Sequence, residues 1–182
     1  MKKYYKDYKI ISKHLSNGKS KKEVMYDGNY YACRLSETEL RKKKIHCLAL
    51  ALCSNATVLG VGLINTSGSR VIYVALPYVS LFIPTFFCLM GVLRFMVVGN
   101  KLEYATFDKS QNRIYRSTIG QIILSSVVAL GDICYLLLYE NIENLLREIV
   151  FLGGMLFVLI ISLRLLIIKK TIIYEVEEPE LS

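Results

Sequence analysis

A single acidic residue, Asp132, interrupts a long apolar run in the second half of the chain. A charged carboxylate inside a membrane costs roughly 2.5–3.5 kcal/mol on insertion scales, so such residues usually face the protein interior. There a carboxyl group can bind a proton or a cation, or it can hold helices together through hydrogen bonds. Because Asp132 is a lone acid, we favour the structural interpretation and keep the functional one as the alternative.

Four other polar residues in the apolar runs are expected at related depths. Tyr78 follows Arg70 by eight residues, and Asp132 precedes Glu140 by eight residues. At helical rise both lie about 12 Å from the same membrane edge. We therefore predict an intramembrane polar cluster that comprises Asp132, Tyr78, Ser80, Asn55 and Thr57.

No residue pattern in the chain is typical of an enzyme or of a metal site. The only histidines, His14 and His46, are far apart, and none of the five cysteines forms a CxxC pair. Glycine-rich phosphate loops, HExxH and GxSxG are missing from the sequence. We expect no enzymatic activity, no catalytic residue, no metal and no cofactor.

The elements that position Asp132 are predicted from runs without charge. There are 25 uncharged residues between Lys44 and Arg70, and 23 between Arg70 and Arg94. A soluble domain of 182 residues cannot bury both runs, which excludes an ordinary globular protein. Since about 20 apolar residues cross a bilayer, the sequence predicts an all-α membrane protein with four transmembrane helices. The expected spans are about 45–66, 71–98, 119–139 and 149–168.

Lysine and arginine counts predict the orientation of these helices. One side of the spans carries 21 basic residues, 13 of them in residues 1–44, and the other side carries only Arg70 and Arg147. By the positive-inside rule both termini are cytoplasmic, and short outer loops make a bacterial inner membrane the expected location. We expect the acidic residues on the outer side to be solvated: Glu140, Glu143 and Glu148.

The two halves of the chain align with each other at an offset of 70 to 73 residues. Leu93-Arg94 matches Leu163-Arg164, for example. This pattern predicts a tandem repeat of one helical hairpin, with both copies in parallel orientation; the alternative is that two apolar hairpins with basic ends simply look alike. The predicted organisation is a basic arm 1–35, a first hairpin 36–98, a basic loop and stalk 99–118, a second hairpin 119–168 and an acidic tail 169–182.

Local patterns predict structure on the cytoplasmic side. Ser36 and Asp108 are good N-cap residues, so helices can begin near Glu37 and Lys109 as stalks outside the membrane. Three segments rich in β-formers, 24–35, 101–107 and 171–177, predict short strands that meet there. The alternative for the acidic tail is a loose segment that leans on the basic stalks.

The basic residues are expected to contact anionic lipid headgroups or a partner protein, and no nucleic acid. The residues singled out are Arg41, Lys42, Lys43, Lys44, Arg94, Arg113, Arg116 and Arg164. The favoured function is a non-enzymatic accessory, scaffold or immunity-type subunit that packs against itself or against another membrane protein. The alternative is a small proton- or cation-coupled transporter that forms a homodimer, with Asp132 as its coupling carboxylate.

Overall fold

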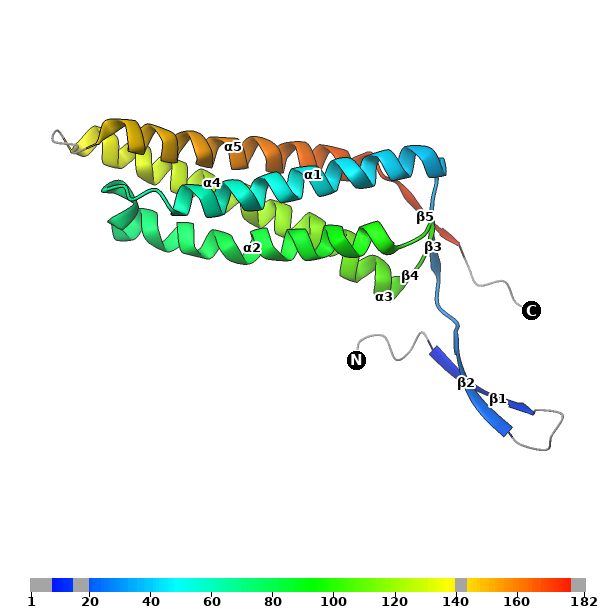
Figure 1. Ribbon diagram of the computed structural model, residues 1–182. Helices are drawn as coiled ribbons and strands as arrows, with labels where there is room; N and C mark the ends of the chain where they lie inside the picture. The colour runs from blue at the N-terminus through cyan, green and yellow to red at the C-terminus, as the bar shows by residue number, and fades with distance from the viewer. Residues whose placement is uncertain (1–7, 15–19, 140–143, 178–182) are drawn as a thin grey trace.

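A computed structural model describes residues 8–14, 20–139 and 144–177 of the chain. Four long helices lie side by side and alternate in direction (Figure 1). They are α1 (Glu37–Gly62), α2 (Ile72–Val97), a third helix built from α3 (Tyr104–Phe107), the π-helical turn η3 (Asp108–Asn112) and α4 (Arg113–Leu138), and α5 (Leu145–Lys170). We call the end of the bundle with the strands the sheet end and the opposite end the loop end (Figure 1).

All four helices are long and apolar enough to span a membrane. The prediction of a multi-pass, four-helix protein is therefore confirmed in the described part of the chain. Two helices extend past their predicted spans at the sheet end, where α1 begins at Glu37 and the third helix at Tyr104. Large apolar side chains such as Leu59, Phe86 and Ile160 stay exposed on the outside of the bundle, as lipid contact requires.

Each helix packs against two neighbours, in the order α1, α2, α4, α5 around the bundle. Buried residues recur at alternating steps of three and four, the spacing of a left-handed helical bundle. In α5 this series is Glu148, Phe151, Met155, Val158, Ser162 and Leu165.

The apolar interior is divided into two clusters along the bundle axis. The sheet-end cluster consists of Leu40, Cys47, Ala51, Cys88, Val92, Phe95, Ile114, Leu165 and Ile172. The loop-end cluster consists of Val58, Val61, Val74, Leu81, Val128, Ala129, Phe151, Met155 and Val158. Polar residues fill the level between them, as described below.

A three-stranded sheet closes the sheet end. Strand β3 (Tyr30–Cys33) lies between β4 (Lys101–Glu103) and β5 (Tyr174–Glu177), antiparallel to both. The three predicted strand segments thus each contribute a strand, and they meet as expected. Within β5, Glu175 pairs with Arg34 and Glu177 with Lys101, so this part of the acidic tail is ordered by the sheet rather than by the stalks.

A separate hairpin of β1 (Tyr8–His14) and β2 (Ser20–Tyr26) projects from the sheet end away from the helices (Figure 1). Tyrosines hold its base to the bundle. The Tyr8 hydroxyl donates to Glu103 Oε2 at 2.8 Å, and the Tyr26 hydroxyl accepts from the Tyr104 backbone N–H at 3.0 Å.

One predicted N-cap is confirmed and the other is wrong. The Ser36 side chain accepts from the Glu39 backbone N–H at the start of α1, as a cap should. Asp108 instead lies inside the third helix with helical backbone angles, and its carboxylate accepts from Asn112 Nδ2 at 3.0 Å. The helix begins earlier because the chain leaves β4 at Glu103 in an extended conformation and turns directly into α3.

Candidate functional site

Two acidic side chains are buried together at the loop end, Asp132 on α4 and Glu148 on α5. Asp132 is 0% exposed and Glu148 is 1% exposed. Oδ1 of Asp132 and Oε2 of Glu148 both lie 2.9 Å from the position that a Cβ atom on Gly68 would take, so they are within about 6 Å of each other. We call these two residues the carboxyl pair.

The loop between α1 and α2 covers the carboxyl pair. Its 3-10 turn η2 (Gly68–Arg70) brings the Gly68 N–H to Glu148 Oε1, at 2.9 Å. Thr66 fixes this turn, because its Oγ1 accepts from the Ser69 N–H at 3.1 Å and its carbonyl accepts from the Ser69 hydroxyl at 2.9 Å. A side chain at Gly68 would meet both carboxyls and the Tyr135 ring, so only glycine fits this approach.

Three of the four carboxyl oxygens have no hydrogen-bond partner within the described residues: both oxygens of Asp132 and Oε2 of Glu148. Arg70, the nearest basic residue to Gly68 in the chain, donates instead to Asn65 Oδ1. Two carboxyl groups at this range cannot both stay ionised without a countercharge, because burial and mutual repulsion both oppose it. Chemically, the carboxyl pair can share a proton or coordinate a small cation between its oxygens.

A second set of buried polar residues lies between the two apolar clusters, at the level of the bundle's middle. Each of the four long helices contributes to this polar layer: Ser54, Thr85, Gln121, Ser125 and Ser162. The Ser162 hydroxyl is within hydrogen-bond distance of Gln121 Oε1, at 3.2 Å. Gln121 Nε2 and Ser54 Oγ have no partner within the described residues. The layer is therefore only partly satisfied, which is costly in an apolar interior.

Polar residues continue along one buried face of the third helix. Gln111, Thr118, Ser125 and Asp132 are all buried and follow each other at intervals of seven residues. At the sheet end Gln111 Nε2 donates to the Tyr174 hydroxyl at 3.0 Å, while its Oε1 has no partner among the described residues. From Gln111 to Asp132 this polar face extends about 30 Å, close to the thickness of a hydrocarbon core.

The predicted intramembrane cluster does not gather around Asp132. The other four side chains each donate to a backbone carbonyl: Tyr78 to Val58, Ser80 to Leu76, Thr57 to Cys53, and Asn55 to Ala51 and Thr85. Ser80 and Thr57 are bonded within their own helices and are half-buried. Asp132 alone joins the carboxyl pair.

Glu148, expected to be solvated, is instead buried, and this expectation was wrong. It lies on the same face of α5 as the buried residues Phe151 and Met155, so its side chain enters the interior of the bundle. Glu140 and Glu143 lie outside the described residues.

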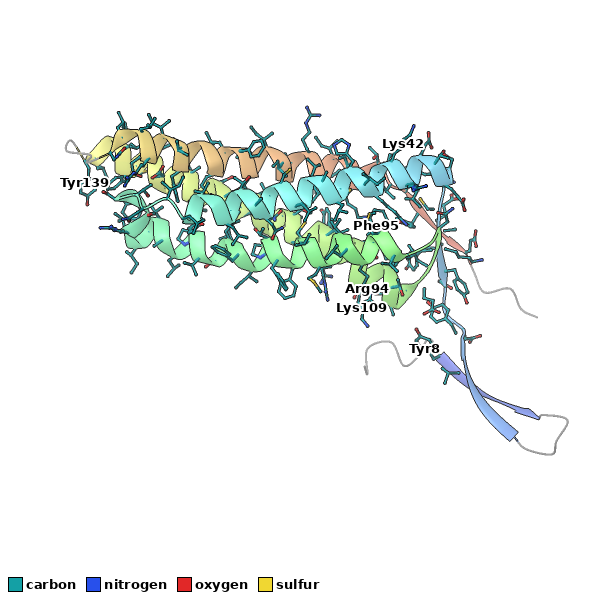
Figure 2. All side chains as sticks on the ribbon, viewed as in Figure 1. Tyr8, Lys42, Arg94, Phe95, Lys109 and Tyr139 are labelled. Atoms are coloured by element: carbon teal, nitrogen blue, oxygen red, sulfur yellow. The ribbon has the colours of Figure 1, made fainter. Side chains whose placement is uncertain are left out.

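Among the basic residues singled out, Lys44 is not free to contact lipid or a partner, contrary to expectation. It is only 9% exposed, and its Nζ donates to the Val98 carbonyl at the end of α2 and lies 5.2 Å from the centre of the Phe95 ring. Lys43 Nζ donates to Thr171 Oγ1 at 2.8 Å, which ties α1 to the end of α5. The remaining residues are exposed or half-buried near the sheet end, with Lys42 and Arg94 shown in Figure 2: Arg41, Lys42, Arg94, Arg113, Arg116 and Arg164.

Sequence reasoning missed both Glu148 and the polar layer, and a sequence pattern was present for the polar layer. Gln121 and Ser125 stand at three-and-four spacing with Val128 and Asp132, so polar residues mark the inner face of an otherwise apolar helix. The length of an apolar run predicts a membrane span but does not separate the inner face of the helix from its outer face.

No protein-family model matches the chain, and neither a curated protein nor a solved structure matches it. The interpretation of the carboxyl pair and the polar layer therefore depends on their geometry and chemistry.

Proposed function

We propose that the protein is a small proton- or cation-coupled membrane transport protein whose coupling site is the carboxyl pair, Asp132 and Glu148. The observation that carries this proposal is the burial of two acidic side chains beneath a glycine turn, with three of their oxygens unpartnered among the described residues. A purely structural acid would be expected to accept hydrogen bonds, and Asp132 accepts none within the described residues.

The polar layer and the polar face of the third helix support the same proposal. A transported proton or cation needs polar groups along the interior, and the buried residues from Gln111 to Asp132 supply them on one helix. Pro77 and Pro84 in α2 are points at which this neighbouring helix can deform, and Gly120 of α4 packs directly against Pro84.

The proposal includes an orientation and a membrane. The loop end carries Arg70 and Arg147, while the other basic residues of the helices lie towards the sheet end. By the positive-inside rule the sheet end, with both termini, is cytoplasmic, in a bacterial inner membrane. The carboxyl pair then lies near the outer side.

The proposed tandem repeat gains support from burial. At an offset of 70 residues, six buried positions of α2 match six buried positions of α5. The matched pairs are Leu81/Phe151, Thr85/Met155, Cys88/Val158, Gly91/Ile161, Val92/Ser162 and Phe95/Leu165. Strands β4 and β5 also follow α2 and the end of α5 and pair with opposite edges of β3, as two parallel copies of a hairpin would.

The test is charge movement at the site, which requires no knowledge of a substrate. Purified protein reconstituted in liposomes on a solid-supported membrane is exposed to jumps in pH, Na⁺, K⁺ or Ca²⁺. Wild-type protein should give a transient current with at least one of these ions, and Asp132→Asn and Glu148→Gln should abolish it. Glu39→Gln, which neutralises an exposed acid at the start of α1, is the matched control and should retain the current.

Two outcomes would contradict the proposal. Currents in Asp132→Asn and Glu148→Gln that equal the wild-type current would remove the carboxyl pair as the site. Wild-type protein without a current for any of the four ions would remove the coupling function itself. Monodisperse elution of each variant from a sizing column shows that the comparison is made on folded protein.

A second candidate, an accessory subunit that binds another protein, is favoured by the projecting hairpin of β1 and β2. An isolated two-stranded hairpin is marginally stable in water, so a bound partner protein would stabilise the hairpin of β1 and β2. Site-specific photo-cross-linking from position 24, an exposed residue on β2, should capture one defined protein in native membranes. Labelling of lipid alone would contradict this candidate.

A further inference from the structure

A cavity of about 310 Å³ opens between α2 and the third helix near the sheet end. Its walls are Phe87 from α2, residues Asp108, Lys109 and Asn112 of the π-helical turn η3, and Arg113, Arg116 and Ser117 of α4. The cavity is far from the carboxyl pair, because Asp132 follows Arg116 by 16 positions along α4.

The cavity is basic. Arg113, Arg116 and Lys109 face one carboxylate, Asp108, which already accepts from Asn112 Nδ2. Neither the Arg113 nor the Arg116 guanidinium forms an ion pair within the described residues. The Arg113 guanidinium carbon lies 5.7 Å from the centre of the Phe87 ring, so the aromatic face fixes one arginine in place and leaves its N–H donors available.

The π-helical turn gives the cavity its shape. A π-helical turn inserts one residue into the helix and rotates the residues before it relative to those after it. Here it brings Asp108, Lys109 and Asn112 to the same opening as Arg113 and Arg116. Single π-helical turns of this kind are frequent at functional sites.

The level of the cavity along the helices is that of lipid headgroups rather than that of acyl chains. Arg113 and Arg116 precede the apolar run of α4, which begins near Ile119. On α2, Phe87 precedes Arg94 by seven residues, so it lies about two helical turns deeper in the bundle than Arg94. Figure 2 shows Arg94 and Lys109 near the same end of the bundle. A phosphate group bound by the two arginines would have its glycerol and acyl chains directed towards Phe87 and the apolar surface.

We propose that this cavity binds the phosphate group of an anionic phospholipid, with Arg113 and Arg116 as the phosphate ligands. Guanidinium groups bind phosphate through paired N–H donors, and basic pockets between transmembrane helices bind anionic headgroups. The site is independent of the carboxyl pair and of the transport function proposed above.

The test is lipid retention measured by native mass spectrometry. Protein is equilibrated in mixed micelles that contain equal amounts of phosphatidylglycerol and phosphatidylcholine. Wild-type protein should retain phosphatidylglycerol in preference. Arg116→Gln should lower this preference about fivefold and the Arg113→Gln/Arg116→Gln variant about twentyfold or more, because each basic residue near an anionic surface contributes about that factor. Arg147→Gln, an exposed arginine at the loop end, is the matched control and should retain the wild-type preference.

Three results would overturn the proposal. Equal retention of both lipids by wild-type protein would mean that the cavity holds no anionic lipid. An unchanged preference in the double variant would place the lipid elsewhere on the basic surface. Displacement of the lipid by glycerol phosphate at equal concentration would identify a soluble phosphate ester as the ligand. Because Arg116 is exposed, the single variant keeps the test valid if the double variant fails to fold.

Discussion

Replacing Asp132 with asparagine should stabilise the helical bundle while removing the proposed site. Neither oxygen of Asp132 has a partner within the described residues, and Glu148 Oε2 beside it has none either. A buried polar group without a partner costs about 1–3 kcal/mol, and replacing buried charged groups is often neutral or stabilising. Asparagine has the same size and its N–H can donate to Glu148 Oε2. We therefore expect the free energy of unfolding to rise by about 1–3 kcal/mol.

A double-mutant cycle separates the carboxyl pair from its surroundings. Glu148→Gln keeps an acceptor for the Gly68 N–H at Oε1 and should also stabilise the protein. Either single change removes the repulsion between the two carboxyl groups. The Asp132→Asn/Glu148→Gln variant should therefore be less stable than the sum of the two single-variant changes in free energy of unfolding predicts, with a coupling energy of about 1–2 kcal/mol. Glu39→Gln, at an exposed position, should change stability by no more than about 0.5 kcal/mol.

The measurement is reversible unfolding in mixed micelles of a mild detergent and dodecyl sulfate, followed by circular dichroism. A loss of more than about 1 kcal/mol in Asp132→Asn would refute the reasoning, because it would mean that the carboxyl makes a stabilising bond. Additive effects in the double variant would show that the two carboxyls do not interact. If Asp132→Asn both raises the free energy of unfolding and abolishes the ion-induced current, Asp132 serves function at a cost in stability.

Three further predictions use the same unfolding measurement. Gly68→Ala should lose about 1–3 kcal/mol, because a Cβ there meets three atoms at 2.9 Å; unchanged stability would show that the turn can withdraw from the carboxyl pair. Gln121→Leu should leave stability unchanged or raise it by up to about 2 kcal/mol, because it removes an unpartnered amide nitrogen, and a loss above about 1 kcal/mol would contradict this. Burial, and then the nearby Cys33, raises the pKa of Tyr174, so the folded state keeps this proton to higher pH than the unfolded chain. Wild-type stability should therefore fall as pH rises above about 10, and Tyr174→Phe should reduce this slope; equal slopes would contradict the argument.

The number of helices, their lengths and the three sheet strands could be predicted from the sequence because each depends on local composition. An uncharged run long enough to cross a bilayer has no other stable arrangement, and the β-rich segments follow directly after helix ends. Ser36 acted as an N-cap because its cap bond is to a residue three positions away. Asp108 failed as one because the preceding strand, paired with β3, determined where the helix begins.

The candidate site could be predicted only in part, because it depends on which helix faces meet. Asp132 was identified as the acid most costly to bury, and this required no knowledge of packing. Glu148 is near the end of its helix, where a charged residue is usually solvated, and only the return of the loop at Gly68 covers it. The N–H of Gly68 is 80 positions away along the chain, a contact that no local pattern encodes.

The proposed repeat supplies an internal comparison for Asp132 and Glu148. At offsets of 71 and 70 residues their counterparts in the first hairpin are Val61 and Tyr78. Val61 is buried in the loop-end cluster, and the Tyr78 hydroxyl donates to the Val58 carbonyl at 2.6 Å, so the first hairpin fills these positions with satisfied groups. The same bundle geometry therefore does not require acids there. If the two hairpins are copies as proposed, a binding function explains why only the second places carboxyl groups at these two positions, at a cost in stability, whereas helix packing does not explain it.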